Sequence, residues 1–318
     1  MRWVGRSLPF LAGFFSGKEM DGASSINGSV QFPSLNVSAR IIENQRAHIG
    51  ADSETMDAIL EKRYSEILET LDPAFLNHVE AKERRLSTPF LVNGPSDPDA
   101  RRIMVIGREY GGNGWNVMHD GGGASVYVTK ALSKHRDFFG RAMAKKGQDR
   151  GDTFFNFMRA LARSVGSEGG LIYSNLLCFD SGGKSPRNSE HFSLVKRLSK
   201  QLLDVQLDHF RPDVVIFANG MDTVGIRREF FPIAGDGKVC VGRRHWEEAG
   251  IPRTQLWEFE LHGRFLCYRI QHPSARSRAA KAARKQLLEV ISQTTHHNPT
   301  VFGGVEGTGS LAAVSSSS

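Results

Sequence analysis

The residue with the clearest chemical context is His272, which follows an apolar run at residues 265–270 and precedes Pro273. Proline lacks an N–H and cannot extend a strand ladder, so the run predicts a strand that ends near this histidine. Ser274 and Ser277 carry hydroxyls suited to capping the N-terminus of a following helix. The sequence therefore predicts a histidine at the carboxyl end of a strand, beside helix N–H groups that favour anions.

Basic side chains crowd the first turns of this expected helix, at Arg276, Arg278, Lys281, Arg284 and Lys285. Cations are disfavoured at a helix N-terminus, and a bound phosphate would offset that cost. A solvated basic helix after an ordinary strand-to-helix turn is the alternative interpretation of the same residues. The formal net charge of +7 and the pI of about 9.4 favour an anionic partner such as nucleic acid.

Two further polar residues stand where other apolar runs end. Residues 103–107 are typical of a buried parallel strand, and Glu109 follows it. Residues 171–177 indicate a second strand, which contains Asn175. Because the carboxyl ends of parallel strands meet at one edge of a sheet, we expect Glu109, Asn175 and His272 to line one crevice. A carboxylate there could orient water, and an amide offers both a donor and an acceptor to a base.

The elements that must position these residues alternate along the chain. Buried strands are predicted at residues 103–107, 171–177, 213–220 and 265–270. Helical periodicity is found at residues 53–86, 152–165, 192–210, 224–231 and 277–291. Alternation at Trp257, Phe259 and Leu261 is typical of a half-buried strand within a mixed stretch. Because strands alternating with helices imply right-handed βαβ units, we predict an α/β fold with three layers, α/β/α, around a mainly parallel four-stranded sheet.

Composition divides the chain into four segments. Residues 1–50 mix Gly, Ser and Asn without a sustained period, so we expect a poorly ordered N-terminal segment. Residues 51–92 predict a helical lead-in, and a turn-rich linker separates it from a main domain at residues 100–293. Residues 294–318 are rich in Gly, Ser and Thr and predict a disordered tail.

These runs and their polar residues resemble the uracil-DNA glycosylase superfamily over roughly residues 100–292. The resemblance rests on Gly-Arg-Glu at 107–109, Ser-Asn-Leu-Leu at 174–177, the strand at 213–220 and His-Pro-Ser-Ala-Arg-Ser at 272–277. In that family a loop after the first strand positions the hydrolytic water, and an aromatic side chain stacks on uracil. An asparagine reads the base edge, and the His-Pro-Ser loop holds the catalytic histidine and inserts into DNA.

The resemblance implies catalytic roles for His272, which would stabilise the leaving uracil anion, and for Glu109, which would act on water. It implies that Asn175 reads the base and that Phe154 or Phe155 is the aromatic platform. The implied DNA-binding residues are Ser274, Arg276, Ser277 and Arg278. The expected activity is hydrolysis of the N-glycosidic bond of uracil, or of another deaminated base, in single- or double-stranded DNA during base excision repair.

The first motif departs from the family pattern. It reads Gly-Arg-Glu-Tyr-Gly-Gly at residues 107–112, where the best-known members have Gln-Asp-Pro-Tyr-His, and glutamate is one methylene longer than aspartate. This departure keeps open an inactive glycosylase-fold protein that binds nucleic acid or a nucleotide. A nucleotide-binding enzyme of other chemistry, using the glycine-rich loop at residues 111–123, is remoter because no P-loop or GxGxxG motif is present.

Cysteine and histidine spacing argues against a resident cofactor. Cys178, Cys240 and Cys267 include no CxxC pair and do not fit the four-cysteine iron–sulfur cluster of some members of that family. His119 and His135 lack partners at metal-ligand spacing, so we predict neither a metal nor a cofactor. Three widely spaced cysteines favour reduced thiols, and no apolar run is long enough to cross a membrane. We expect a cytoplasmic monomer with DNA as its partner and no membrane contact.

Overall fold

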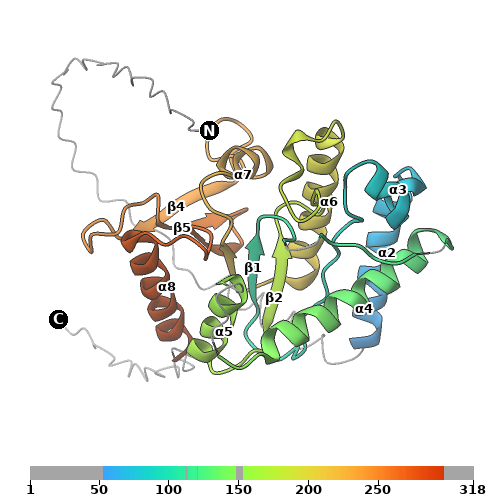
Figure 1. The fold of residues 1–318 in the computed structure, drawn as a ribbon. Helices are drawn as coiled ribbons and strands as arrows, with labels where there is room; N and C mark the ends of the chain where they lie inside the picture. Colours follow the sequence, from blue (N-terminus) through green and yellow to red (C-terminus); the bar gives the residue numbers. More distant parts are fainter. Residues whose placement is uncertain (1–52, 112–113, 120, 148–152, 297–318) are drawn as a thin grey trace, which may run out of the picture. The chain divides into compact units, whose positions relative to one another are not determined.

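The computed structural model describes residues 53–111, 114–119, 121–147 and 153–296, with the secondary structure shown in Figure 1. The expectation of a poorly ordered segment at residues 1–50 lies outside the described residues. The same holds for most of the expected tail, although the last helix extends as far as His296.

A six-stranded mixed sheet forms the centre of the described chain, with strand order β2-β1-β3-β6-β5-β4. Its strands are β1 (Ile103–Gly107), β2 (Leu171–Asn175), β3 (Val214–Phe217), β4 (Cys240–His245), β5 (Leu256–Leu261) and β6 (Phe265–Ile270). Strands β2, β1, β3 and β6 run parallel, and β5 and β4 continue the sheet in antiparallel fashion. The predicted α/β class is confirmed, whereas the predicted four-stranded sheet is wrong because two antiparallel strands extend it beyond β6.

The exposure of strand β4 explains why the sequence did not predict it. Only Cys240 is buried in it, and the other residues of the strand, including Arg243 and Arg244, are exposed. It lies at the end of the sheet, with an irregularity in its pairing between Gly242 and Arg244. Charges and bulges are usual on edge strands, where they discourage pairing with another chain. Such a strand has no apolar alternation, so hydrophobic periodicity does not reveal it.

The helices are α2 (Ser53–Leu68), α3 (His78–Glu83), α4 (Gly123–Ala144), α5 (Thr153–Val165), α6 (Phe192–Phe210), α7 (Val224–Phe230) and α8 (Arg278–His296), with short 3-10 turns at Pro73–Phe75 and Pro186–Asn188. None of them, in the part of the chain that is described, combines the length and the apolar character needed to cross a bilayer. Helix α4 was not predicted from the sequence. Its buried face contains several alanines and His135, so its apolar periodicity is weak.

The helical lead-in shares the core of the main domain. Helix α2 packs against α4 and α6. Its buried Tyr64 donates a hydrogen bond of 3.1 Å to the carbonyl oxygen of Val92. The segment that follows pairs with the chain after β2, since the N–H of Phe90 donates to the Cys178 carbonyl at 2.6 Å. Residues 53–296 therefore form one packed unit as far as they are described.

Candidate active site

The parallel strands bring the predicted residues to one edge of the sheet. Gly107 at the end of β1 lies opposite Asn175 at the end of β2, as Cα partners in the parallel register. Glu109 follows β1, and His272 follows β6. Since β1 and β6 both flank β3, the loops after these strands emerge at the same edge.

Phe154, at the start of α5, links the two sides of this edge. Its ring centroid lies 5.9 Å from that of His272, with an angle of 33° between the planes. The same ring lies 5.3 Å from that of Tyr173. A Cβ placed on Gly107 would come within 3.3 Å of the Phe154 ring and 2.5 Å of the Asn175 Oδ1. One small volume therefore contains the Phe154 ring, the His272 ring and the Asn175 amide. Gly107 leaves room for these side chains because it has no Cβ.

Asn175 is buried and only partly hydrogen-bonded. Its Nδ2 donates to the Tyr173 hydroxyl at 3.2 Å, while its Oδ1 is buried and has no hydrogen-bond partner among the described residues. An unsatisfied buried amide oxygen costs about 1–3 kcal/mol, so such an atom calls for an explanation. A ligand that donates a hydrogen bond to this oxygen would supply one.

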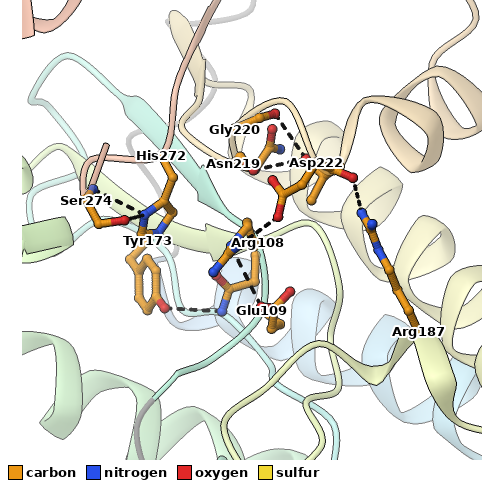
Figure 2. Close-up of polar contacts among 11 residues, drawn as sticks. Arg108, Glu109, Tyr173, Arg187, Asn219, Gly220, Asp222, His272 and Ser274 are labelled. Atoms are coloured by element: carbon orange, nitrogen blue, oxygen red, sulfur yellow. Dashed lines mark hydrogen bonds and ion pairs between the residues drawn. The ribbon is translucent and has the colours of Figure 1, made fainter. Parts of the chain in front are cut away.

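His272 is held in a defined tautomer. The Ser274 hydroxyl lies 2.7 Å from its Nδ1, and the backbone N–H of Ser274 donates to the same atom at 3.3 Å (Figure 2). An Nδ1 that accepts from an N–H carries no proton, so the ring proton resides on Nε2. Burial, followed by the positive charge of Arg108, lowers the pKa of His272 to about 4. At neutral pH the ring is therefore uncharged and presents an Nε2–H donor.

Glu109 is a nearly buried carboxyl group, with its side chain 7% exposed. Burial raises its pKa above the usual range, and the charge of Arg108 opposes that shift. The Arg108 Nε lies 3.8 Å from the Glu109 Oε1. A desolvated carboxylate with a raised pKa is typical of a group that accepts a proton during a reaction.

Arg108 and Asp222 belong to this site but were not predicted from the sequence. Figure 2 shows Arg108 between the two acidic groups, with its Nη1 donating to Asp222 at 2.7 Å. Arg187 donates to the Asp222 carbonyl oxygen, which ties the loop after β3 to the 3-10 turn at Pro186–Asn188. Asp222 follows β3, so the rule that located Glu109 and His272 at strand ends could have located it as well.

The remaining predicted residues lie at the rim or in the core. Phe155 is 8% exposed and packs on Phe138 and Tyr173, so it belongs to the core beside Phe154. The Ser277 hydroxyl accepts from the Ala280 N–H at 3.1 Å and caps α8, as the sequence indicated. The side chains that are exposed at this end of α8 are Ser274, Arg276, Ser277 and Arg278.

The cysteines lie inside the sheet and its immediate surroundings. Cys178, Cys240 and Cys267 are buried and unpaired. Burial raises the pKa of Cys178 to about 12 and that of Cys240 to about 11, and it raises that of Cys267 well above the ordinary value. Within the described residues, no group of three His, Cys, Asp or Glu side chains is arranged to hold a metal ion.

Comparisons with known proteins assign no family to this chain. No protein-family model matches it, and no curated protein matches its sequence significantly. The geometry of the site therefore carries the functional argument.

The space at Gly107 gives a first prediction. Replacing Gly107 by alanine places a methyl group 2.5 Å from the Asn175 Oδ1, a separation at which one of the two groups must shift. Overpacking of this kind typically costs about 1–3 kcal/mol, so we expect the Gly107→Ala protein to be less stable than wild type by roughly that amount. The free energy of unfolding measures the effect, and Gly140→Ala, on an open face of α4, is the control because nothing lies within 4 Å of its added Cβ.

Proposed function

We propose that this protein is a DNA glycosylase of the uracil-DNA glycosylase type, built on a three-layer α/β/α arrangement. It hydrolyses the N-glycosidic bond of uracil or of another deaminated base in DNA. The observation that carries the proposal is the unsatisfied, buried Asn175 Oδ1 in one small volume with Phe154 and the neutral His272. An edge of uracil donates from its N3–H and accepts at its carbonyl oxygens, which complements an amide oxygen and an imidazole N–H.

In the proposed chemistry, His272 stabilises the negative charge that develops on the base. Cleavage of the bond to uracil leaves negative charge on the base and positive charge on the sugar. The Nε2–H of a neutral histidine can donate to the carbonyl oxygen on which that negative charge grows. Ser274 supports this role because it occupies Nδ1 and keeps the proton on the opposite nitrogen.

Glu109 is the residue that acts on the sugar side. Its carboxylate can orient a water molecule for attack and stabilise the positively charged centre. Arg108 favours the ionised form of Glu109, and Asp222 opposes it. Phe154 provides a ring face for the base once the nucleotide has left the stack.

Base release is the direct test. Purified protein is incubated with single- and double-stranded oligonucleotides that contain one uracil, and alkali then cleaves the abasic sites formed. Thymine-containing oligonucleotides serve as the substrate control, and His272→Ala protein identifies cleavage by a contaminating glycosylase. Release of uracil by wild-type protein alone supports the proposal. If wild-type protein releases no deaminated base, the glycosylase proposal is overturned. The alternative that then remains is a protein that binds nucleic acid or a nucleotide.

DNA affinity should depend on the exposed arginines at the start of α8. Phosphate contacts release counterions, so the double replacement of Arg276 and Arg278 by alanine should weaken binding with little dependence on sequence. The salt dependence of log K should also fall, by roughly 0.7–0.9 per lost contact. Fluorescence anisotropy over a salt series measures both quantities. The control removes two exposed arginines elsewhere, Arg136 on α4 and Arg197 on α6. Equal affinities for the two double variants would contradict the assignment.

A further inference from the structure

Two arginines are buried behind the loop that follows β3. Arg227 of α7 is 7% exposed and Arg269 of β6 is 5% exposed. The Nη1 of Arg227 donates to the Asn219 Oδ1 at 3.1 Å, and the Nη1 of Arg269 lies 2.8 Å from the Met221 sulfur. The two guanidinium groups thus hold neighbouring residues of one short loop.

Neither guanidinium has an acidic partner within the described part of the chain. Arg269 donates to main-chain oxygens, those of Thr254 at 2.8 Å and of Arg253. Its Nε is buried without a hydrogen-bond partner among the described residues, and so is the Nδ2 of Asn219. Carbonyl oxygens satisfy N–H groups but do not neutralise a positive charge, and an unpaired buried charge is costly.

Two exposed arginines add to this charge. Besides burial, the charges of Arg269 and Arg228 lower the pKa of Arg227, to about 9. Burial, then Arg253 and Arg228, lower the pKa of Arg269 to about 10. Arg228 and Arg253 are exposed, and Arg253 lies over the ring of Trp257 at 4.8 Å from its centroid. Each buried guanidinium group is therefore repelled by two other arginines, which raises the free energy of the folded chain unless an anion is bound.

The cluster adjoins the candidate active site. Gly220 lies between Asn219 and Met221, with φ at +78°, and a Cβ on it would come 3.5 Å from the backbone nitrogen of His272. Figure 2 shows Asn219 and Gly220 on the same side of the site as Asp222. Met221 is 38% exposed, and its sulfur contacts the Arg269 guanidinium.

We propose that Arg227, Arg228, Arg253 and Arg269 form a phosphate-binding site beside His272. A thioether sulfur is a weak acceptor, whereas phosphate oxygens accept charge-assisted and bidentate hydrogen bonds from guanidinium groups. A phosphate that displaces the Met221 side chain supplies the negative charge that the surrounding carbonyl oxygens lack. The site itself depends only on these arginines, and its assignment to the backbone of a DNA substrate rests on the proposed function.

The test uses the full chain and inorganic phosphate. The thermal unfolding midpoint is measured in phosphate and in chloride at equal ionic strength, for wild type and for the Arg228→Ala/Arg253→Ala variant. The Arg136→Ala/Arg197→Ala variant is the control, since it loses the same charge and reports the general stabilisation that phosphate gives to any protein. A ligand that binds only the folded chain raises the midpoint by mass action. We expect equal phosphate-dependent shifts for wild type and control, and a shift at least halved in the Arg228→Ala/Arg253→Ala variant.

A second measurement identifies the source of the phosphate. Affinity for a single-stranded oligonucleotide is measured for the same three proteins, and we expect the salt dependence of log K to fall by roughly 0.7 per lost contact in the Arg228→Ala/Arg253→Ala variant. Loss of the phosphate shift with unchanged DNA binding supports a site for a free phosphate or a nucleotide. Equal phosphate shifts in all three proteins overturn the site. Failure of wild-type protein to release uracil affects neither measurement, so the two proposals fail separately.

Discussion

Replacing His272 by alanine should slow the release of uracil from DNA by roughly 10²–10³-fold, the usual effect of removing one donor to a developing anion. The expected loss lies in kcat, because the Nε2–H acts on charge that is absent from the bound substrate. His272→Gln is a useful companion, because its amide N–H restores a donor and should recover part of the rate. Single-turnover rates with a uracil-containing oligonucleotide measure both effects.

DNA affinity separates this explanation from misfolding. His272 lies beside Phe154 and is supported by Ser274. Neither Arg276 nor Arg278 contacts it among the described interactions. Binding of the His272→Ala protein to undamaged DNA should therefore stay within a few-fold of wild type. Wild-type rates of uracil release by His272→Ala protein would remove this histidine from the active site and leave the glycosylase proposal without its anion-stabilising group.

Replacing Glu109 by glutamine should slow base release by roughly 10²–10⁴-fold, the range for loss of a general base. The amide keeps the size of the side chain but cannot accept a proton from water. The pH profile of kcat/KM gives an independent readout. Burial raises the pKa of Glu109, so the carboxylate is lost as pH falls through a value above that of an ordinary glutamate. The acidic limb of the wild-type profile should therefore lie above the usual carboxyl range, and it should disappear in Glu109→Gln protein.

Stability should change in the opposite direction to activity. A carboxyl group whose pKa is higher in the folded state than in the unfolded state destabilises the fold once pH exceeds the unfolded value. Glu109→Gln should therefore raise the thermal midpoint at neutral pH, and this gain should vanish at a pH where both states are protonated. A lower midpoint at neutral pH, together with an unchanged rate of base release, would show that Glu109 serves the packing of its loop.

The sequence predicted the parallel half of the sheet because a strand that is buried on both faces is a nearly continuous apolar run. Strands β1 and β6 have the predicted bounds, since each is an apolar run that ends at a glycine or just before a proline. The topological rule for strand ends likewise located Glu109, Asn175 and His272 at one edge. By contrast, β4 is exposed and charged, and α4 buries alanines and a histidine, so neither element has a strong apolar period.

The phosphate-binding proposal depends on burial that the sequence shows only in part. Arg269 is the one charged residue in the apolar run of β6. A charged residue within a buried strand indicates an unusual environment, because arginine is rarely buried. Arg227 has no such signal, because it lies beside Arg228 in a short helix where either residue could face solvent. Only the folded chain, in which Arg227 is buried and Arg228 is exposed, decides which of the two turns inward. The distinction between these neighbours is therefore a property of tertiary structure.

The burial of all three cysteines makes thiol chemistry a monitor of local opening. A thiol reagent needs both contact with sulfur and ionisation, and the native environment suppresses both for Cys178, Cys240 and Cys267. Labelling then proceeds through transient exposure, and its rate reports the free energy of that exposure. The three sulfurs sample the chain after β2, the edge strand β4 and the interior strand β6. Rates resolved by peptide mass would show whether the antiparallel extension opens independently of the parallel strands that carry the candidate active site.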